Sequence, residues 1–115
     1  SHAFILKKID LIYQFDYDEN STKIIDLPYC NINEIESNTF QNFTTLDGLF
    51  LDNNAFSHLK ANFFSGLSNL TILRLNRNFI EKIDSNVFDD LENLRKLDLS
   101  DNLLEYGSLD QKVRN

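Results

Sequence analysis

The amino-acid sequence repeats itself with a period of 24 residues. The segment that begins at Leu46, LDGLFLDNNAFSHLKANFFSGLSN, aligns without a gap with the segment that begins at Leu70, LTILRLNRNFIEKIDSNVFDDLEN. Another copy precedes them from Thr22, and a fourth begins at Leu94 and loses the pattern at Gly107. A period of this size is typical of solenoids and other repeat arrays, in which no unit can bury its apolar side chains alone.

Each unit contains a strand pattern followed by apolar residues that return to the core. The pattern LxxLxL places its last two leucines on one face of a strand, so we expect them to point inward. Successive strands are then expected to pair in parallel, about 4.8 Å apart. Phenylalanines in the rest of each unit are expected to lie in the core, and they are Phe40, Phe43, Phe56, Phe64 and Phe88.

The position just after each strand is occupied by Asn54, Asn78 and Asn102 in three units and by Cys30 in the first. The chain must turn sharply there, which leaves backbone groups inside the coil. An asparagine side chain can satisfy such groups because it carries two donors and an acceptor. Cys30 is interpreted as the same kind of residue, because the chain has no second cysteine and no nearby histidine for a metal or redox site.

Residues 22–106 resemble the leucine-rich repeats, whose consensus is LxxLxLxx(N/C)xLxxLxxxxFxxLxx. The 24-residue form with a late Phe is similar to the subclass common in extracellular animal proteins, including Toll-type receptors, Slit-like proteins and insect immune repeat proteins. The resemblance implies an α/β-type solenoid with a parallel sheet on its concave face and a mostly irregular or short helical convex side. It also implies binding of a protein ligand or co-receptor, in a receptor, adhesion or innate-immune protein.

The first 21 residues differ from the units at 22–45, 46–69 and 70–93 and from the partial unit at 94–115. Apolar residues alternate with mostly polar ones, which predicts a half-buried strand. A turn at Asp18–Ser21 then leads into the first repeat strand, at Lys23–Leu27, so we expect an N-terminal β-hairpin that caps the solenoid. The alternating apolar residues are Ile9, Leu11, Tyr13, Phe15 and Tyr17.

Metal, cofactor and catalytic sites are not expected. Asp16, Asp18 and Asn20 have the spacing of the start of a calcium loop, but Ser21 and Leu27 stand where that loop needs Gly and Glu. The two histidines are not placed to activate a nucleophile in any known motif, and the three glycines form no phosphate loop. We therefore expect a chain that is not an enzyme and holds no cofactor; any chemistry would lie outside this segment.

Composition fits an interaction module and leaves its compartment open. The net charge of −7 argues against nucleic acid and anionic membranes as partners. A single cysteine cannot form the disulfide caps usual in extracellular members of the family, so an intracellular scaffold or regulatory protein is the alternative. N-glycosylation sequons favour an extracellular protein, secreted or an ectodomain, and lie away from the strand face, at Asn20, Asn42 and Asn69.

The outward side of the repeat strands is the expected binding surface. Its predicted columns include Ile24, Gly48, Ile72 and Lys96, and beside them Asp26, Phe50, Arg74 and Asp98. Aromatic and Arg side chains are enriched in binding hot spots, so Phe50 is the expected anchor, and Phe79 at the rim is a lesser candidate. The predicted ligand-binding residues are Phe50, Arg74, Ile72, Tyr29, Arg77, Asp52 and Asn76.

The C-terminal unit lacks the later apolar residues of a full copy. We expect its coil to expose the edges of Leu97, Leu99 and Leu104, together with unpaired strand backbone. Either the natural protein continues beyond Asn115, or this uncapped end self-associates or binds a partner.

Overall fold

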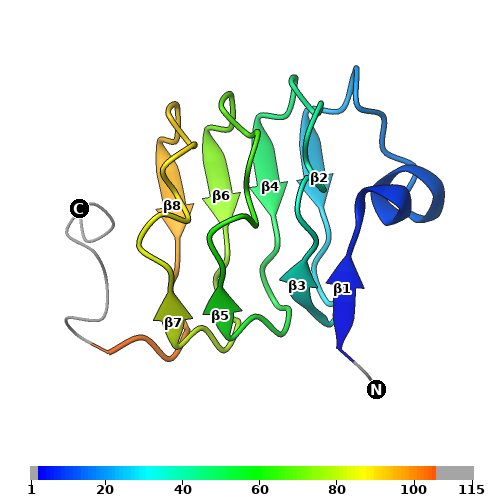
Figure 1. The fold of residues 1–115 in the computed structure, drawn as a ribbon. Coiled ribbons are helices and arrows are strands. Elements are labelled where there is room, and N and C mark those ends of the chain that lie inside the picture. The colour runs from blue at the N-terminus through cyan, green and yellow to red at the C-terminus, as the bar shows by residue number, and fades with distance from the viewer. Residues whose placement is uncertain (1–2, 106–115) are drawn as a thin grey trace.

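The computed structural model describes residues 3–105. Its main feature is a four-stranded parallel sheet with the strand order β2-β4-β6-β8. Ile24 pairs with Gly48, Gly48 with Ile72 and Ile72 with Lys96, so each coil adds one strand in the register of the repeat (Figure 1). The strands are β2 (Ile24–Asp26), β4 (Gly48–Phe50), β6 (Ile72–Arg74) and β8 (Lys96–Asp98).

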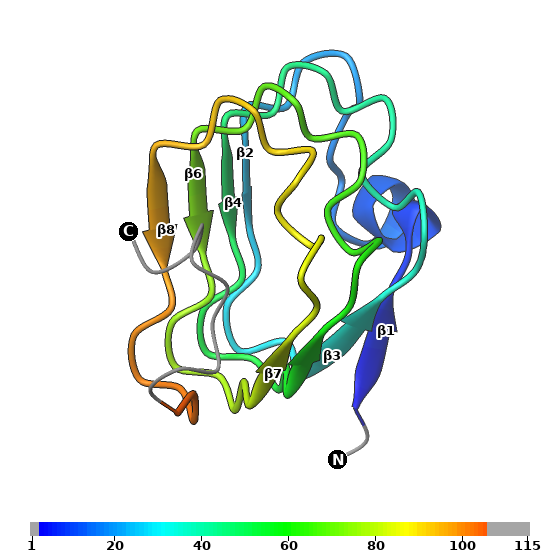
Figure 2. The same ribbon diagram turned by 60° about the vertical axis from the view of Figure 1, so that its left-hand side comes forward.

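Two smaller parallel sheets lie on the return side of the coils (Figure 2). They pair β1 (Phe4–Leu6) with β3 (Ile32–Ile35), and β5 (His58–Leu59) with β7 (Lys82–Ile83). The connections are mostly turns, and a solenoid of parallel strands with little helix is therefore confirmed.

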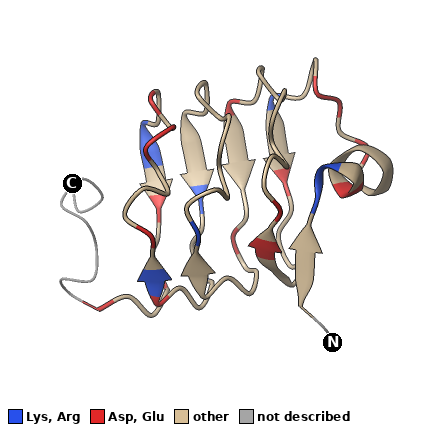
Figure 3. Cartoon of the chain, viewed as in Figure 1, with Lys and Arg blue, Asp and Glu red and all other residues tan. Residues whose placement is uncertain are grey.

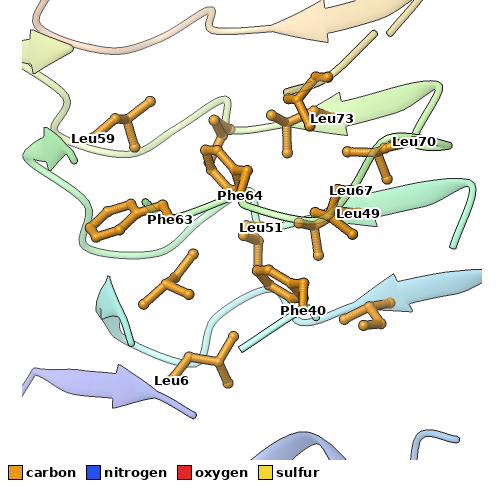
Figure 4. Close-up of a cluster of buried hydrophobic side chains, with 14 of the residues drawn as sticks. Leu6, Phe40, Leu49, Leu51, Leu59, Phe63, Phe64, Leu67, Leu70 and Leu73 are labelled. Carbon is orange, nitrogen blue, oxygen red and sulfur yellow. The ribbon is translucent and has the colours of Figure 1, made fainter. Parts of the chain in front are cut away.

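The inward leucines of the strands and the phenylalanines of the return segments form one core (Figure 4). All five phenylalanines predicted to be buried are buried. The ring of Phe64 stacks on that of Phe88 at a centroid distance of 6.3 Å and meets Phe63 edge-on at 6.2 Å. Aromatic contacts thus join two successive coils on the side opposite the large sheet.

The asparagines after the strands form the expected internal ladder. Asn54 Oδ1 accepts the backbone N–H groups of Cys30 and Ile32, and its Nδ2 donates to the carbonyl oxygens of Leu27 and Leu51. Asn78 and Asn102 repeat three of these four bonds one and two coils later; the bond from the N–H of the preceding ladder residue is described for Asn54 alone. Each asparagine therefore closes its own turn and holds the preceding coil.

Cys30 occupies the first position of this ladder, as predicted. Its thiol donates to the carbonyl oxygen of Pro28, two residues earlier, just as Asn54 donates to that of Asp52. Phe4 and Phe15 line a hollow beside it, and burial raises the pKa of the Cys30 thiol. The other ladder residues bond to backbone groups of the preceding repeat coil. The first repeat coil has no such neighbour, so a small apolar thiol suits this position.

The sharp turn before each ladder residue uses a left-handed backbone. The residues at this position have φ values between 56° and 57°, and they are Tyr29, Asn53, Arg77 and Asp101. Asn and Asp adopt this conformation with little strain, whereas Tyr and Arg do so uncommonly. The turn projects the side chains of Tyr29 and Arg77 outward, where both are exposed.

The N-terminal segment differs from the predicted hairpin. Residues Asp10–Gln14 form a single π-helical turn, η1, and the capping strand is the earlier β1, which pairs in parallel with β3. Asp10 Oδ2 accepts the N–H of Lys7 and starts the turn, which buries Leu11 but exposes Ile9 and Tyr13. The alternating pattern was therefore wrongly interpreted as a strand. The expected turn at Asp18–Ser21 is present.

The outer edge of β2 is not paired with another described strand and is contacted by a tyrosine hydroxyl. Tyr17 Oη accepts the backbone N–H of Asp26 at 3.0 Å and lies 3.3 Å from the Asp26 carbonyl oxygen. These contacts cap the edge of the large sheet at one backbone position, and the rest of the cap comes from packing of Phe15 and Tyr17 on the core.

The last described coil is less well covered than the central ones. Leu97, Leu99 and Leu104 are half-buried, whereas the equivalent Leu73 and Leu75 are buried. This agrees with the exposed edges expected there. The predicted loss of the repeat begins at Gly107, which lies outside the described residues. The predicted self-association of the C-terminal end depends in part on those residues and stays a prediction.

Candidate functional site

The outward side of β2, β4, β6 and β8, here called the strand face, carries the candidate site. Alternation along each strand turns Ile25, Leu49 and Leu73 into the core, where all three are buried, and turns their neighbours outward. Phe50 is thereby placed beside Asp26 on one flank and Arg74 on the other. The outward columns deduced from the repeat are therefore the ones that the strand register produces.

A three-layer stack occupies the centre of the strand face. The ring of Phe50 lies over Gly48: a Cβ atom at Gly48 would lie only 3.2 Å from Cε1 of the ring and 3.3 Å from Cζ. The guanidinium carbon of Arg74 lies 4.1 Å from the centroid of the same ring. Phe50 is consequently half-buried between a glycine backbone and an arginine, which is more cover than the sequence led us to expect.

Aliphatic side chains flank this stack. Ile24 is 45% exposed, and its Cδ1 would lie 3.6 Å from a Cβ atom at Gly48. Ile72 pairs with Gly48 from the other side and is half-buried. Together with Phe50 these residues form a small apolar area in the middle of the sheet, which a partner side chain could cover.

Charges surround the apolar area (Figure 3). Basic residues lie on β6 and β8, none lies on β4, and acidic residues lie on β2 and β8. The hydroxyl of Ser100, 2.6 Å from Asp98 Oδ1, and then the Ser100 backbone N–H hold the pKa of Asp98 below its usual value; Arg74 acts in the same direction. Asp98 is thus an ionised carboxylate that is directed to Ser100.

The remaining predicted binding residues lie where the strands end. Asp52 and Asn76 are half-buried, and Asp52 Oδ2 accepts a hydrogen bond from Asn53 Nδ2 at 2.8 Å. Arg77 forms an ion pair with Asp101 at 3.6 Å, and Tyr29 is 78% exposed. These residues belong to the stacked loops rather than to the stack around Phe50, so they form a rim of the same face.

A second exposed apolar pair lies beyond the ladder. Phe79 is exposed, as predicted, and Leu103 occupies the equivalent position one coil later and is also exposed. Leu103 was missed, although the repeat places it in the column of Phe79. The pair is the main competitor of the strand face as a contact surface.

The three sequons are not structurally equivalent. Asn20 and Asn42 are exposed, and Asn42 adopts a left-handed φ of 75°. Asn69 is exposed as well, but its Nδ2 donates to the carbonyl oxygen of Thr44 at 2.9 Å, and Asn93 donates likewise to Ser68 at 2.7 Å. Asn69 therefore has a structural role between coils that a glycan on its amide nitrogen would disturb.

We expect Asn69→Ala to lower the free energy of unfolding by about 1 kcal/mol, the usual contribution of one intramolecular hydrogen bond. Asn20→Ala should change it by less than about 0.5 kcal/mol, since it removes an exposed side chain in a turn. Urea unfolding followed by circular dichroism measures both variants. Equal effects would mean that the Asn69–Thr44 bond contributes nothing to stability.

Charged pairs on the return side join successive coils. Lys60 pairs with Glu34, and His58 Nε2 lies 2.7 Å from Asp84 Oδ1, with both residues of the second pair partly exposed. The hydrogen bond with His58, together with the N–H of Ala61, holds the pKa of Asp84 below its ordinary value. No nucleophile is hydrogen-bonded to His58 among the described contacts, so the pair is interpreted as a link between coils.

Two further features are absent from residues 3–105. No group of three or more His, Cys, Asp or Glu side chains in this part of the chain is arranged to hold a metal ion. No helix in the same part is long and apolar enough to cross a membrane.

Comparisons with known proteins agree with the fold. Residues 20–71 and 44–104 match the family model described as leucine rich repeat. A solved chain in the structure of the Toll–Spatzle complex, described as a molecular hub in Drosophila development and innate immunity, superposes with a TM-score of 0.67 at 27% identity. The match covers 71% of this chain but only 11% of that one. A comparison with curated proteins gives no match.

Proposed function

The chain belongs to the leucine-rich repeat family, and on that premise we propose that it is a protein-recognition module whose partner binds the strand face. The observation that carries this proposal is the stack of Gly48, Phe50 and Arg74 with its aliphatic flanks. Aromatic and Arg side chains that lie centrally in a face are the residue types enriched in binding hot spots. Neighbouring charges on β2, β6 and β8 provide the polar rim typical of such interfaces.

The setting we propose is the extracellular part of a receptor, adhesion or innate-immune protein. The similarity to a chain from the Toll–Spatzle complex supports this setting, although this chain spans only 11% of the length of that one. The sequons at Asn20 and Asn42 support it too, because both side chains are exposed and N-glycosylation occurs on surface loops of secreted proteins. A protein ligand or co-receptor is the corresponding class of partner.

A screen of the purified chain against secreted and cell-surface proteins of its source organism tests the proposal. With any partner found, Phe50→Ala should weaken binding by about 2 kcal/mol or more, as hot-spot residues do, whereas Phe79→Ala should leave it unchanged. Isothermal titration calorimetry gives both affinities, and circular dichroism shows whether each variant is folded. Asn42→Gly is the control on the return side, because glycine accepts the left-handed φ of 75° at that position.

The reverse pattern would contradict the proposal: a partner that Phe79→Ala releases and Phe50→Ala does not binds the Phe79–Leu103 pair. The compartment has a separate test. Intact-mass analysis of the native protein before and after enzymatic deglycosylation should show a glycan, and peptide mapping should place it on Asn20 or Asn42. A native protein found unglycosylated in the cytosol would instead support the intracellular scaffold or regulatory protein.

A further inference from the structure

The guanidinium of Arg74 has no hydrogen-bond or ion-pair partner among the described residues, whereas several other cations of the chain are paired. Arg77 is paired with Asp101, Lys8 with Glu19 and Lys60 with Glu34. Arg74 instead contacts the face of Phe50, at 4.1 Å from the ring centroid. This contact places the guanidinium carbon against the ring, and the N–H donors of Arg74 bond to no other described side chain.

The stack places the guanidinium over the ring of Phe50 before any ligand arrives. Gly48 leaves room for the ring of Phe50, because a Cβ atom there would lie 3.2 Å from the ring and would require it to shift by a few tenths of an ångström. Arg74 follows in register on the adjacent strand and covers the ring. Such ordering removes part of the entropy that a long side chain would otherwise lose on binding.

The strand register places the acidic residue Asp98 beside Arg74, but its carboxylate does not form an ion pair with the guanidinium. It pairs with Arg74 across β6 and β8, but its Oδ1 accepts hydrogen bonds from the N–H and the hydroxyl of Ser100. No ion pair between Asp98 and Arg74 is present. The planar donor edge of Arg74 therefore remains available next to the apolar side chains of Ile24, Phe50 and Ile72.

We propose that Arg74, supported by Phe50 on Gly48, is a binding site for a side-chain carboxylate of the partner protein. The guanidinium fork matches a carboxylate through two parallel N–H···O bonds, and this geometry is specific to arginine. The aliphatic flanks would receive apolar residues next to that carboxylate. The inference rests on the proposed function, since it names the chemistry that the strand face recognises.

The test uses two acetylated and amidated peptides, one with a glutamate between two leucines and one with glutamine in its place. Two-dimensional NMR of the ¹⁵N-labelled chain follows the Nε–Hε signal of Arg74 during titration. We expect a saturable shift with the glutamate peptide and at least about fivefold weaker binding of the glutamine peptide. This difference should shrink as salt is raised, because an exposed ion pair is screened.

Variants separate the roles of the three residues. Arg74→Lys keeps the charge but loses the fork, and it should remove most of the preference for glutamate. Phe50→Ala should remove the ring-current shift of the Arg74 side chain and weaken the glutamate peptide about two- to fivefold, the strength of an exposed cation–π contact. Lys60→Ala, which alters a cation of the return side already paired with Glu34, should bind like the wild type.

Three results would overturn the inference: equal binding of the two peptides, an Arg74→Lys variant with unchanged preference, or a Lys60→Ala variant that loses binding. Failure here is distinguishable from failure of the proposed function. A protein partner lost in Phe50→Ala, with no glutamate preference at Arg74, would leave the strand face as the binding surface without a carboxylate site. A glutamate preference at Arg74, with a partner that binds at Phe79, would support the carboxylate site and contradict the strand face as the partner's binding surface.

Discussion

Replacing Phe64 with alanine should lower the free energy of unfolding by about 3–5 kcal/mol, the usual effect of removing a fully buried aromatic side chain. Phe64 is 1% exposed and contacts Phe63 and Phe88, so the substitution leaves a cavity between two coils and ends both ring contacts. The surrounding coils can relax only partly because parallel strands hold them in register. Urea unfolding followed by circular dichroism and by tyrosine fluorescence measures the change.

Phe79→Ala is the matched control. It removes the same side chain from a position that is 57% exposed, so we expect a change below about 1 kcal/mol. If the two substitutions lowered stability equally, the distinction between inward and outward positions of the repeat would be wrong. Both variants should retain the circular dichroism spectrum of the wild type at low urea.

Asn78→Ala should lower the free energy of unfolding by about 2–4 kcal/mol, although it removes few atoms. The side chain accepts the N–H of Phe56 and donates to the carbonyl oxygens of Leu51 and Leu75. Alanine leaves the buried N–H of Phe56 without a partner, which costs about 1–3 kcal/mol before local relaxation. It also removes one hydrogen bond from each of the two carbonyl oxygens, which keep the side chains of Asn54 and Asn102 as partners. The same urea experiment measures the change.

Two other asparagines calibrate this result. Asn102→Ala should have a smaller effect than Asn78→Ala because Asn102 makes the same bonds in the last described coil but is only half-buried, so water can replace the amide. Asn62→Ala, at an exposed position in a turn, should change stability by less than about 0.5 kcal/mol. An Asn78 effect no larger than that of Asn62 would show that the ladder is not a source of stability.

The repeat made the solenoid predictable because each position is represented several times. A buried column such as Ile25, Leu49 and Leu73 is visible in the sequence as a column of apolar residues, and the register of the strands follows from the constant spacing. The N-terminal segment has no second copy against which its pattern could be checked. Its alternation suited a strand, but Asp10 bonding to Lys7 and burial of Leu11 favour a tight helical turn.

The strand face was predictable in position but not in contact geometry. The columns placed Phe50 beside Arg74, and the strand register confirms that they are neighbours. That the ring lies flat depends on Gly48, whose missing side chain affects a residue two positions along the same strand. In the same way, the sequon at Asn69 gave no sign that its amide bonds to Thr44, since the bond joins residues from different coils. Whether these residues form a binding site stays a prediction.

The constant 24-residue spacing between paired strands bears on how the chain folds. Ile25 pairs with Leu49, and Leu49 with Leu73, so each new coil closes a chain loop of the same length. Loop-closure entropy depends on loop length, and it therefore opposes every step equally instead of growing with the size of the molecule. Folding can nucleate wherever two coils first associate and then spread in both directions. We expect the coils of β4 and β6, whose inward side chains are buried, to provide that nucleus and the less well covered coil of β8 to join it last.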